Sequence, residues 1–203
     1  MRHHRSTLVD ATAARGLNRA CQTGRHPDRD RGVDLYETPA PAVEALLRVE
    51  QLPHRIWEPA CGRGAIVDVL RAAGHEVVAT DLMDYGAGTG GIDFLKTTIA
   101  PANTVLTDPP FKDAARFAAH GLKLCPRVIL LLRLAFYESV SRTDLLERQG
   151  LARIHVFRNR LPMMHRAGWT GRRASSAMPF AWFVWDRGHR GKTEVDRISW
   201  VRS

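Results

Sequence analysis

The stretch Thr107-Asp108-Pro109-Pro110-Phe111 lies where an expected buried strand ends and an expected helix begins. Open α/β sheets bind their ligands at the carboxyl ends of the strands. The two prolines stiffen the turn and remove backbone donors, which leaves carbonyl oxygens free to accept hydrogen bonds. We therefore predict that Asp108 and the Pro109 carbonyl face one donor group together, with Phe111 as a flat lid for a planar substrate. The plainer alternative is a strand end followed by prolines in the first turn of a helix.

A loop with two glycines is the second informative stretch. A short strand beginning at Ile56 leads into Glu58-Pro59-Ala60-Cys61-Gly62-Arg63-Gly64, and a helical segment, a β-branched strand and Asp81 follow. Glycines let the backbone approach a ligand closely, and an acid at the end of the second strand can accept from both ribose hydroxyls. The GxG pattern, rather than GxGxxG, favours a nucleoside ligand over a dinucleotide. A tight turn is the ordinary alternative.

The remaining elements alternate between strands and helices, which favours a mainly parallel α/β sheet. Thr38 is expected to cap a helix that starts at Pro39, and residues 36–39 are expected to line a ligand pocket. Val140, Leu145 and Leu146 are expected to face inward from a helix. The strands are expected at 56–58, 76–80, 91–95, 104–107, 128–132, 152–157 and 177–185, and the helices at 39–50, 65–73, 112–124 and 139–149. The tail with Ile198, Trp200 and Val201 is expected to cover the sheet.

Composition limits the class of protein. The chain has 203 residues, 44% of them hydrophobic, which is enough for one domain with a sizeable core. No apolar run approaches the ~20 residues that span a bilayer, and no signal peptide is evident. The three cysteines show no CxxC pairing, so we expect no metal site and no disulfide, in a cytoplasmic protein. We predict a basic, flexible N-terminal arm over 1–32 and a single domain over 33–203.

The formal net charge is +9. Because arginine pairs with phosphate and stacks on bases, this charge favours a nucleic acid partner, although solvated basic faces are the alternative. The segment from Arg158 to Arg173 is the candidate substrate-facing loop. Candidate nucleic-acid contacts are Lys112, Arg158, Arg160, Arg166, Arg172 and Arg173.

The order of strand, glycine loop, helix, strand with Asp81, and strand with Asp-Pro-Pro-Phe resembles that of class I S-adenosylmethionine-dependent methyltransferases. The Asp-Pro-Pro-Phe stretch resembles the [D/N/S]-P-P-[Y/F/W] motif of the amino-group branch, and the chain is similar to small enzymes of phages and prophages. The resemblance covers Tyr36 to Trp185. A first-position Asp looks more like the adenine-N6 enzymes than the cytosine-N4 or protein-glutamine enzymes.

This resemblance implies a Rossmann-like sheet of seven strands in the order 3-2-1-4-5-7-6, with the seventh strand antiparallel and helices on both faces. It also implies S-adenosylmethionine as cofactor, with Asp108, Pro109, Pro110 and Phe111 as the catalytic residues. The residues that it implies for cofactor binding are Tyr36, Thr38, Glu58, Pro59, Ala60, Gly62, Gly64, Asp81, Leu82, Asp93 and Phe94.

The implied activity is methyl transfer to adenine N6 in DNA. Alternatives are an amine in RNA, a protein glutamine, or a non-catalytic nucleic-acid-binding subunit of the same fold; a nicotinamide oxidoreductase is disfavoured by the single GxG. Since the sheet uses nearly the whole chain, no separate target-recognition domain is expected. Specificity is then expected to be loose, to read a short site, or to be supplied by a partner subunit or a dimer.

Overall fold

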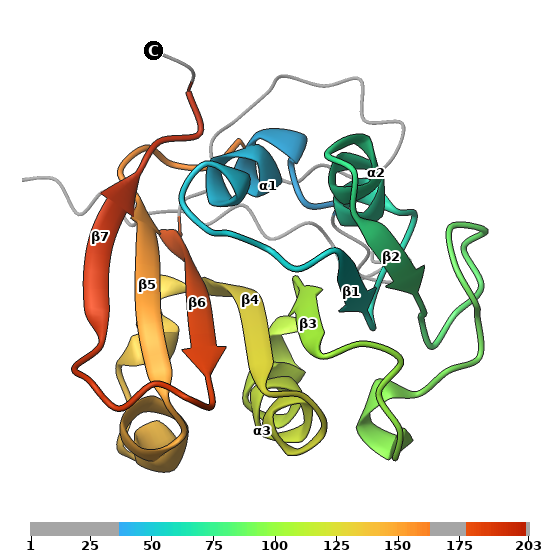
Figure 1. The fold of residues 1–203 in the computed structure, drawn as a ribbon. Helices are drawn as coiled ribbons and strands as arrows, with labels where there is room; N and C mark the ends of the chain where they lie inside the picture. Colours follow the sequence, from blue (N-terminus) through green and yellow to red (C-terminus); the bar gives the residue numbers. More distant parts are fainter. Residues whose placement is uncertain (1–36, 163–177, 202–203) are drawn as a thin grey trace, which may run out of the picture. The chain divides into compact units, whose positions relative to one another are not determined.

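The structure, a computed structural model, describes residues 37–162 and 178–201. Seven strands form one sheet in the order β2-β1-β3-β4-β6-β5-β7. Strand β6 runs antiparallel to both of its neighbours, and the other pairings are parallel (Figure 1). The strands are β1 (Arg55–Glu58), β2 (Glu76–Ala79), β3 (Thr104–Thr107), β4 (Arg127–Arg133), β5 (Leu151–Phe157), β6 (Phe180–Asp186) and β7 (Glu194–Ile198). This Rossmann-like arrangement confirms the expected fold class.

Helices cover both faces of the sheet (Figure 1). Helices α1 (Ala40–Leu47) and α2 (Ala65–Ala72) pack on one face, and α3 (Ala114–Leu124) packs on the other. Residues 128–132 of β4 are all apolar because the strand is buried on both faces. Ile129 and Leu131 join the first core, whereas Val128, Leu130 and Leu132 join the second. A strand buried on both faces needs apolar residues at every position.

The edge strands differ from those expected. Residues 91–95 form no strand, because the Asp93 side chain accepts from Leu95 N at 3.0 Å and starts the short 3₁₀ helix η2 (Phe94–Lys96). Among the described residues, an isolated bridge between Thr80 and Thr89 is the only pairing beyond β2. At the other edge, β7 pairs with β5 and extends the sheet. Of the tail residues that were expected to cover it, Ile198 and Trp200 pack with the first core and Val201 is exposed.

Residues 139–149 do not form the single regular α-helix that was expected. It is divided into the 3₁₀ helix η5 (Val140–Arg142) and the π-helix η6 (Asp144–Arg148), which follow the 3₁₀ helix η4 (Leu134–Tyr137). Val140 is 91% exposed, although Leu145 and Leu146 pack against the core as expected. Trp185 Nε1 donates to the Leu145 carbonyl at 2.8 Å, so this carbonyl is bonded to β6.

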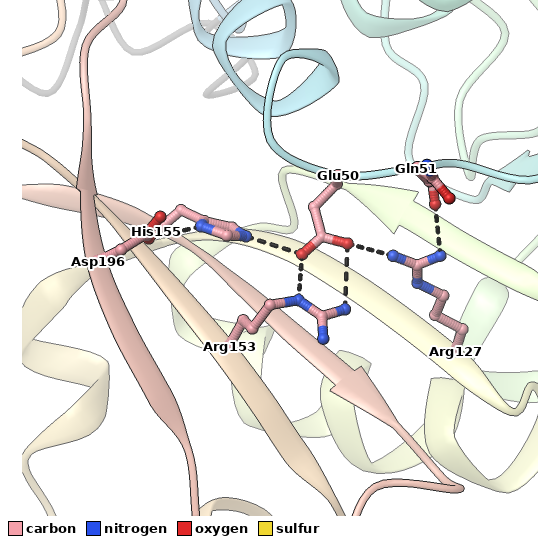
Figure 2. A network of polar contacts seen from close by, with 6 residues as sticks. All are labelled: Glu50, Gln51, Arg127, Arg153, His155 and Asp196. Carbon is pink, nitrogen blue, oxygen red and sulfur yellow. Dashed lines mark hydrogen bonds and ion pairs between the residues drawn. The ribbon is translucent and has the colours of Figure 1, made fainter.

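A polar network joins the end of α1 to the far half of the sheet (Figure 2). The buried Glu50 carboxylate accepts from Arg127 on β4, from Arg153 on β5, and from His155 Nε2 at 2.8 Å. On its other side, the His155 ring bonds Asp196 on β7 through Nδ1 at 2.6 Å. One buried carboxylate just after α1 thus bonds β4 and β5 directly and reaches β7 through His155.

Candidate active site

A cavity of about 630 Å³ opens at the carboxyl ends of β1, β2 and β3. Three loops line it, each following one of these strands, together with residues 92–95 and the chain just before α1. Parallel strands present their carboxyl ends at one edge, so segments far apart in sequence meet here. The loop after β3 continues into η3 (Phe111–Asp113), which also lines the cavity.

The glycine loop is shaped by positive φ angles. Gly62 has φ 52° and Gly64 has φ 93°, and the loop passes directly into α2. Gly62 N donates to Asp81 Oδ2 at 2.8 Å, and Met83 N donates to Asp81 Oδ1 at 2.9 Å. The predicted ribose-binding acid therefore also clamps the loops after β1 and β2 together.

Asp108 directly follows β3, and its two carboxyl oxygens have different surroundings. Oδ2 accepts from Thr38 Oγ1 at 2.9 Å, whereas Oδ1 is buried and has no hydrogen-bond partner within the described residues. Burial raises the pKa of Asp108 to about 7, against the opposing effects of the Thr38 hydrogen bond and the Arg133 charge. This carboxyl group therefore changes charge near neutral pH.

Thr38 does not have its expected role as helix cap. The N-cap of α1 is Pro39, and no side chain caps it. Instead the Thr38 hydroxyl reaches a carboxylate 70 positions along the chain. The sequence did not predict this pairing, because a threonine before proline can cap a helix through local backbone donors and needs no distant partner.

Glu58 ends β1 and is 2% exposed. Its Oε2 atom is buried and has no hydrogen-bond partner within 37–162 and 178–201. Burial, followed by the charges of Asp108 and Asp81, raises the pKa of Glu58 well above its usual range. A cation or a hydrogen-bond donor in the cavity would relieve this cost.

The cavity is acidic although the chain is basic overall. Its lining includes two basic residues, Arg63 and Lys112. Six acids line the same space: Glu37, Glu58, Asp81, Asp93, Asp108 and Asp113. Such a lining favours a ligand with positive charge.

Phe111 lies at the cavity and is 37% exposed. The Arg133 guanidinium carbon is 4.1 Å from the Phe111 ring centroid, and the Phe180 ring is 5.9 Å away. Arg133 and Phe180 are register partners on β4 and β6. Arg133 directly follows the apolar run expected as a strand at 128–132, and its contact with Phe111 was not predicted.

Asp93 and Phe94 also line the cavity, but Phe94 is 2% exposed and packs on Trp57, Phe117 and His120. Its ring is thus part of the core that supports the cavity. Asp93 pairs with Lys96 at 3.2 Å. Neither contact was visible from the sequence pattern around 91–95.

Most of the predicted site residues come together. The cavity lining contains the predicted residues Thr38, Glu58, Pro59, Ala60, Gly62, Asp81, Leu82, Asp93, Phe94, Asp108, Pro109, Pro110, Phe111 and Lys112. Gly64 shapes the adjoining turn. Arg158 and Arg160 are exposed and are not part of this lining. Tyr36, Arg166, Arg172, Arg173 and the predicted arm over 1–32 lie outside the described residues.

Cys61 lines the cavity beside Glu58 and Asp81. Burial, with the charges of these two acids, raises the pKa of the Cys61 thiol to about 11. The thiol is therefore neutral at physiological pH and is a poor nucleophile.

Among the described residues, no group of three or more His, Cys, Asp or Glu side chains could hold a metal ion, and no helix is long and apolar enough to cross a membrane.

Solved structures share this architecture. A proposed RNA methyltransferase from Pyrococcus horikoshii superposes with a TM-score of 0.55 at 12% identity, over 75% of this chain and 86% of its own. A proposed class I S-adenosylmethionine-dependent methyltransferase from Listeria monocytogenes gives 0.55 at 13% identity, over 79% and 65% of the two chains. The chain has the Rossmann-like methyltransferase fold.

The modification subunit of a proposed type I restriction enzyme from Vibrio vulnificus also matches, with a TM-score of 0.53 at 16% identity. The match covers 83% of this chain but about half, 48%, of that subunit. No protein-family model matches the sequence, and no curated protein matches it significantly. At these identities the likeness is one of fold.

Proposed function

We propose that this protein transfers a methyl group from S-adenosylmethionine to an exocyclic amino group, with adenine N6 in DNA as the favoured target. The observation that carries the proposal is the asymmetric Asp108 carboxyl group beside the cavity. One oxygen is held by Thr38, and the other is buried without a hydrogen-bond partner within the described residues. A substrate N–H group would supply that partner.

The cavity suits this cofactor in charge and shape. When bound, S-adenosylmethionine supplies a methyl group activated by a positively charged sulfur, and it also carries an ammonium group. Glu58 offers a buried, unpartnered oxygen, and the glycine loop offers backbone close to the ligand. We assign the methionine part to residues 58–64, the ribose to Asp81 with Leu82, and the adenine to Asp93 with Phe94. Thr38 is assigned to the wall of the same cavity. Tyr36 stays a predicted cofactor contact.

The catalytic roles follow from the amine's chemistry. The lone pair of an aryl amine is delocalised into its ring, which makes the nitrogen a poor nucleophile. Asp108 Oδ1 and the Pro109 carbonyl would accept the two N–H bonds, favour a pyramidal nitrogen and stabilise the positive charge that grows on it. Pro110 stiffens this turn, and Phe111 would pack against the base. The neutral Cys61 thiol supports direct transfer without a covalent enzyme intermediate.

Nucleic acid is the favoured substrate because of the net charge of +9. A duplex base must leave the stack to reach a cavity at the end of a sheet. Two of the fold neighbours have nucleic-acid-related names, the proposed RNA methyltransferase and the restriction modification subunit. We propose that Lys112, Arg158 and Arg160 contact phosphates, and that a partner subunit or a second copy supplies target recognition.

Transfer of a tritiated methyl group tests the proposal. Purified full-length protein is incubated with labelled S-adenosylmethionine and separate DNA, ribosomal RNA and protein fractions. We expect label in DNA, at N6-methyladenine, and none with Asp108→Ala. Label confined to RNA or protein would keep the chemistry and overturn the substrate, whereas unlabelled fractions with no cofactor uptake would support a non-catalytic binding subunit.

A further inference from the structure

Asp108 accepts a hydrogen bond from a residue that is far from it in the sequence. Thr38 stands just before α1 and is 6% exposed. Its hydroxyl donates to Asp108 Oδ2 at 2.9 Å. Because Oδ2 already has this donor and Oδ1 is buried with no partner among the described residues, Oδ1 is the oxygen left to accept from a ligand. Thr38 thus decides which oxygen of Asp108 is available.

Arg133 acts from the neighbouring strand. It ends β4, which pairs in parallel with β3, the strand that leads into Asp108. Its guanidinium lies over the Phe111 ring, 4.1 Å from the centroid. Phe180, its register partner on β6, contacts the same ring. One face of Phe111 is therefore covered by a planar cation, and the ring is held by two neighbouring strands.

Most of the charged residues that line the cavity with Asp108 are acids, and burial is the cause that raises the pKa of Asp108 itself. Glu58 on β1 and Asp81 after β2 are both acids at the same end of the sheet. Glu37 before α1 and Asp113 on η3 also line the cavity, and the basic residues of the lining are Arg63 and Lys112. Thr38 and Arg133 are the two groups that act on Asp108 in the opposite direction.

We propose that Thr38 and Arg133 are positioning residues for Asp108 and Phe111: Thr38 binds Oδ2 and leaves Oδ1 for a substrate donor, and Arg133 holds the Phe111 ring beside that carboxyl group. The catalytic meaning of this arrangement rests on the proposed function. The contacts themselves do not depend on it. A flat substrate would then pack against the exposed part of Phe111.

Direct titration of Asp108 tests the arrangement in the full-length, cofactor-free protein. Carboxyl-labelled aspartate is followed by NMR in wild type, Thr38→Val and Arg133→Gln, with Asp108→Asn used to assign the signal. We expect the Asp108 pKa to rise from about 7 in both variants, by roughly 0.5 or more. Thr38→Ser and Arg133→Lys keep the hydroxyl and the charge and should restore most of the wild-type value.

A matched control separates the local charge from the net charge. Arg55→Gln also removes one arginine, but Arg55 lies at the other end of β1 and pairs with Glu76. It should leave the Asp108 titration unchanged. An unchanged Asp108 titration in both Thr38→Val and Arg133→Gln would overturn the proposal, as would an equal change in Arg55→Gln.

Kinetics distinguish a failed positioning role from a failed function. In an active enzyme, we expect kcat at pH 6.5 to fall at least about 2-fold in Arg133→Gln, with the KM for the methyl donor nearly unchanged, because Arg133 does not line the cavity. A loss that appears only in KM would overturn the positioning role. Absence of methyl transfer in wild type would overturn the proposed function, whereas the NMR titration would still decide whether the two residues control Asp108.

Discussion

The two oxygens of the Asp108 carboxyl group differ in their surroundings, and this difference determines what the residue can do. Oδ2 is bonded to Thr38, and Oδ1 is buried with no partner in the part of the chain that the structure describes. Buried polar atoms usually have a hydrogen-bond partner, and exceptions often mark functional positions. Asp108 is therefore the residue whose substitution is most informative.

Asp108→Ala should abolish methyl transfer, with a loss of at least about 100-fold in kcat, because alanine has no oxygen that could accept from the substrate amine and stabilise the charge that grows on it. The dissociation constant of S-adenosylmethionine should change by less than about 3-fold. Calorimetry and a tritium assay measure the two quantities. Asp144→Ala, on the exposed surface of η6, is the control. Equal losses in binding and turnover would mean that Asp108 has a structural role.

Methyl transfer should depend on pH through the same carboxyl group. The pKa of Asp108 is raised to about 7 by burial, so the ionised fraction falls as the pH falls through neutrality. We expect kcat/KM for the methyl donor, which reports the free enzyme, to decline on the acid side with a midpoint near this value. A profile that stays flat down to pH 5.5 would contradict the requirement for an ionised Asp108.

Gly64→Ala should weaken cofactor binding. Gly64 has φ +93°, and an added Cβ would lie 3.0 Å from the Ala87 Cβ. Gly74→Ala is a matched control, because Gly74 has φ +90° with no atom within 4 Å of its added Cβ and lies at the other end of α2. Both variants should lose about 1–2 kcal/mol of unfolding free energy. Only Gly64→Ala should also raise the dissociation constant of S-adenosylmethionine.

At the scale of elements, Glu50 holds α1 to β4 and β5 (Figure 2). Burial raises the pKa of Glu50, but hydrogen bonds from His155 and Arg153 and the charges of Arg153 and Arg127 lower it to about 2. Glu50→Gln should lower the unfolding free energy at pH 7 by about 3 kcal/mol, because two arginines lose their buried partner. Denaturant unfolding measures this loss, with the exposed Glu138→Gln as control. A loss no larger than that of the control would contradict the role of Glu50.

His155 makes the stability of the same network depend on pH. Burial lowers the His155 pKa, but the bonds to Glu50 and Asp196 outweigh it and raise the pKa above its usual value. A raised folded-state pKa contributes stability that is present below the unfolded value of about 6.5 and is lost as the pH rises through the folded value. His155→Gln should therefore destabilise the protein more at pH 5.5 than at pH 9, as measured by thermal unfolding. An equal loss at both pH values would contradict this.

Two segments have a secondary structure that the local sequence pattern did not predict. Residues 91–95 have the composition of a strand, but the Asp93 side chain satisfies the Leu95 backbone donor and turns the chain into η2. Residues 139–149 have helical composition, but Trp185 on a distant strand bonds a carbonyl within the segment. In both places a side-chain hydrogen bond replaced the backbone bond that the pattern predicts.

At the scale of the whole molecule, a net charge of +9 coexists with a cavity lined by six acids and two basic residues. We expect the two kinds of ligand to respond differently to salt. DNA affinity should fall by at least about 10-fold between 50 and 200 mM salt, because phosphate contacts release counterions. S-adenosylmethionine affinity should change by less than about 3-fold, since partly buried charges are screened less. Equal sensitivity of both ligands would contradict a separate, basic nucleic-acid surface.

The sequence by itself determined the alternation of strands and helices, the glycine loop, and the position of the Asp-Pro-Pro-Phe stretch at the end of a strand. These features depend on short-range properties, namely apolar periodicity, glycine at positive φ and proline at fixed φ. It also placed Glu58, Asp81 and Asp108 at the carboxyl ends of strands, which the sheet then brings to one cavity.

Only the tertiary structure decided which side chains meet. The hydrogen bond from Thr38 to Asp108 spans 70 positions, and the bond from His155 to Glu50 spans 105. Arg133 reaches Phe111 only because β4 lies next to β3. Such contacts depend on strand order and register, which bring distant residues within a few ångströms and leave no periodic trace in the sequence.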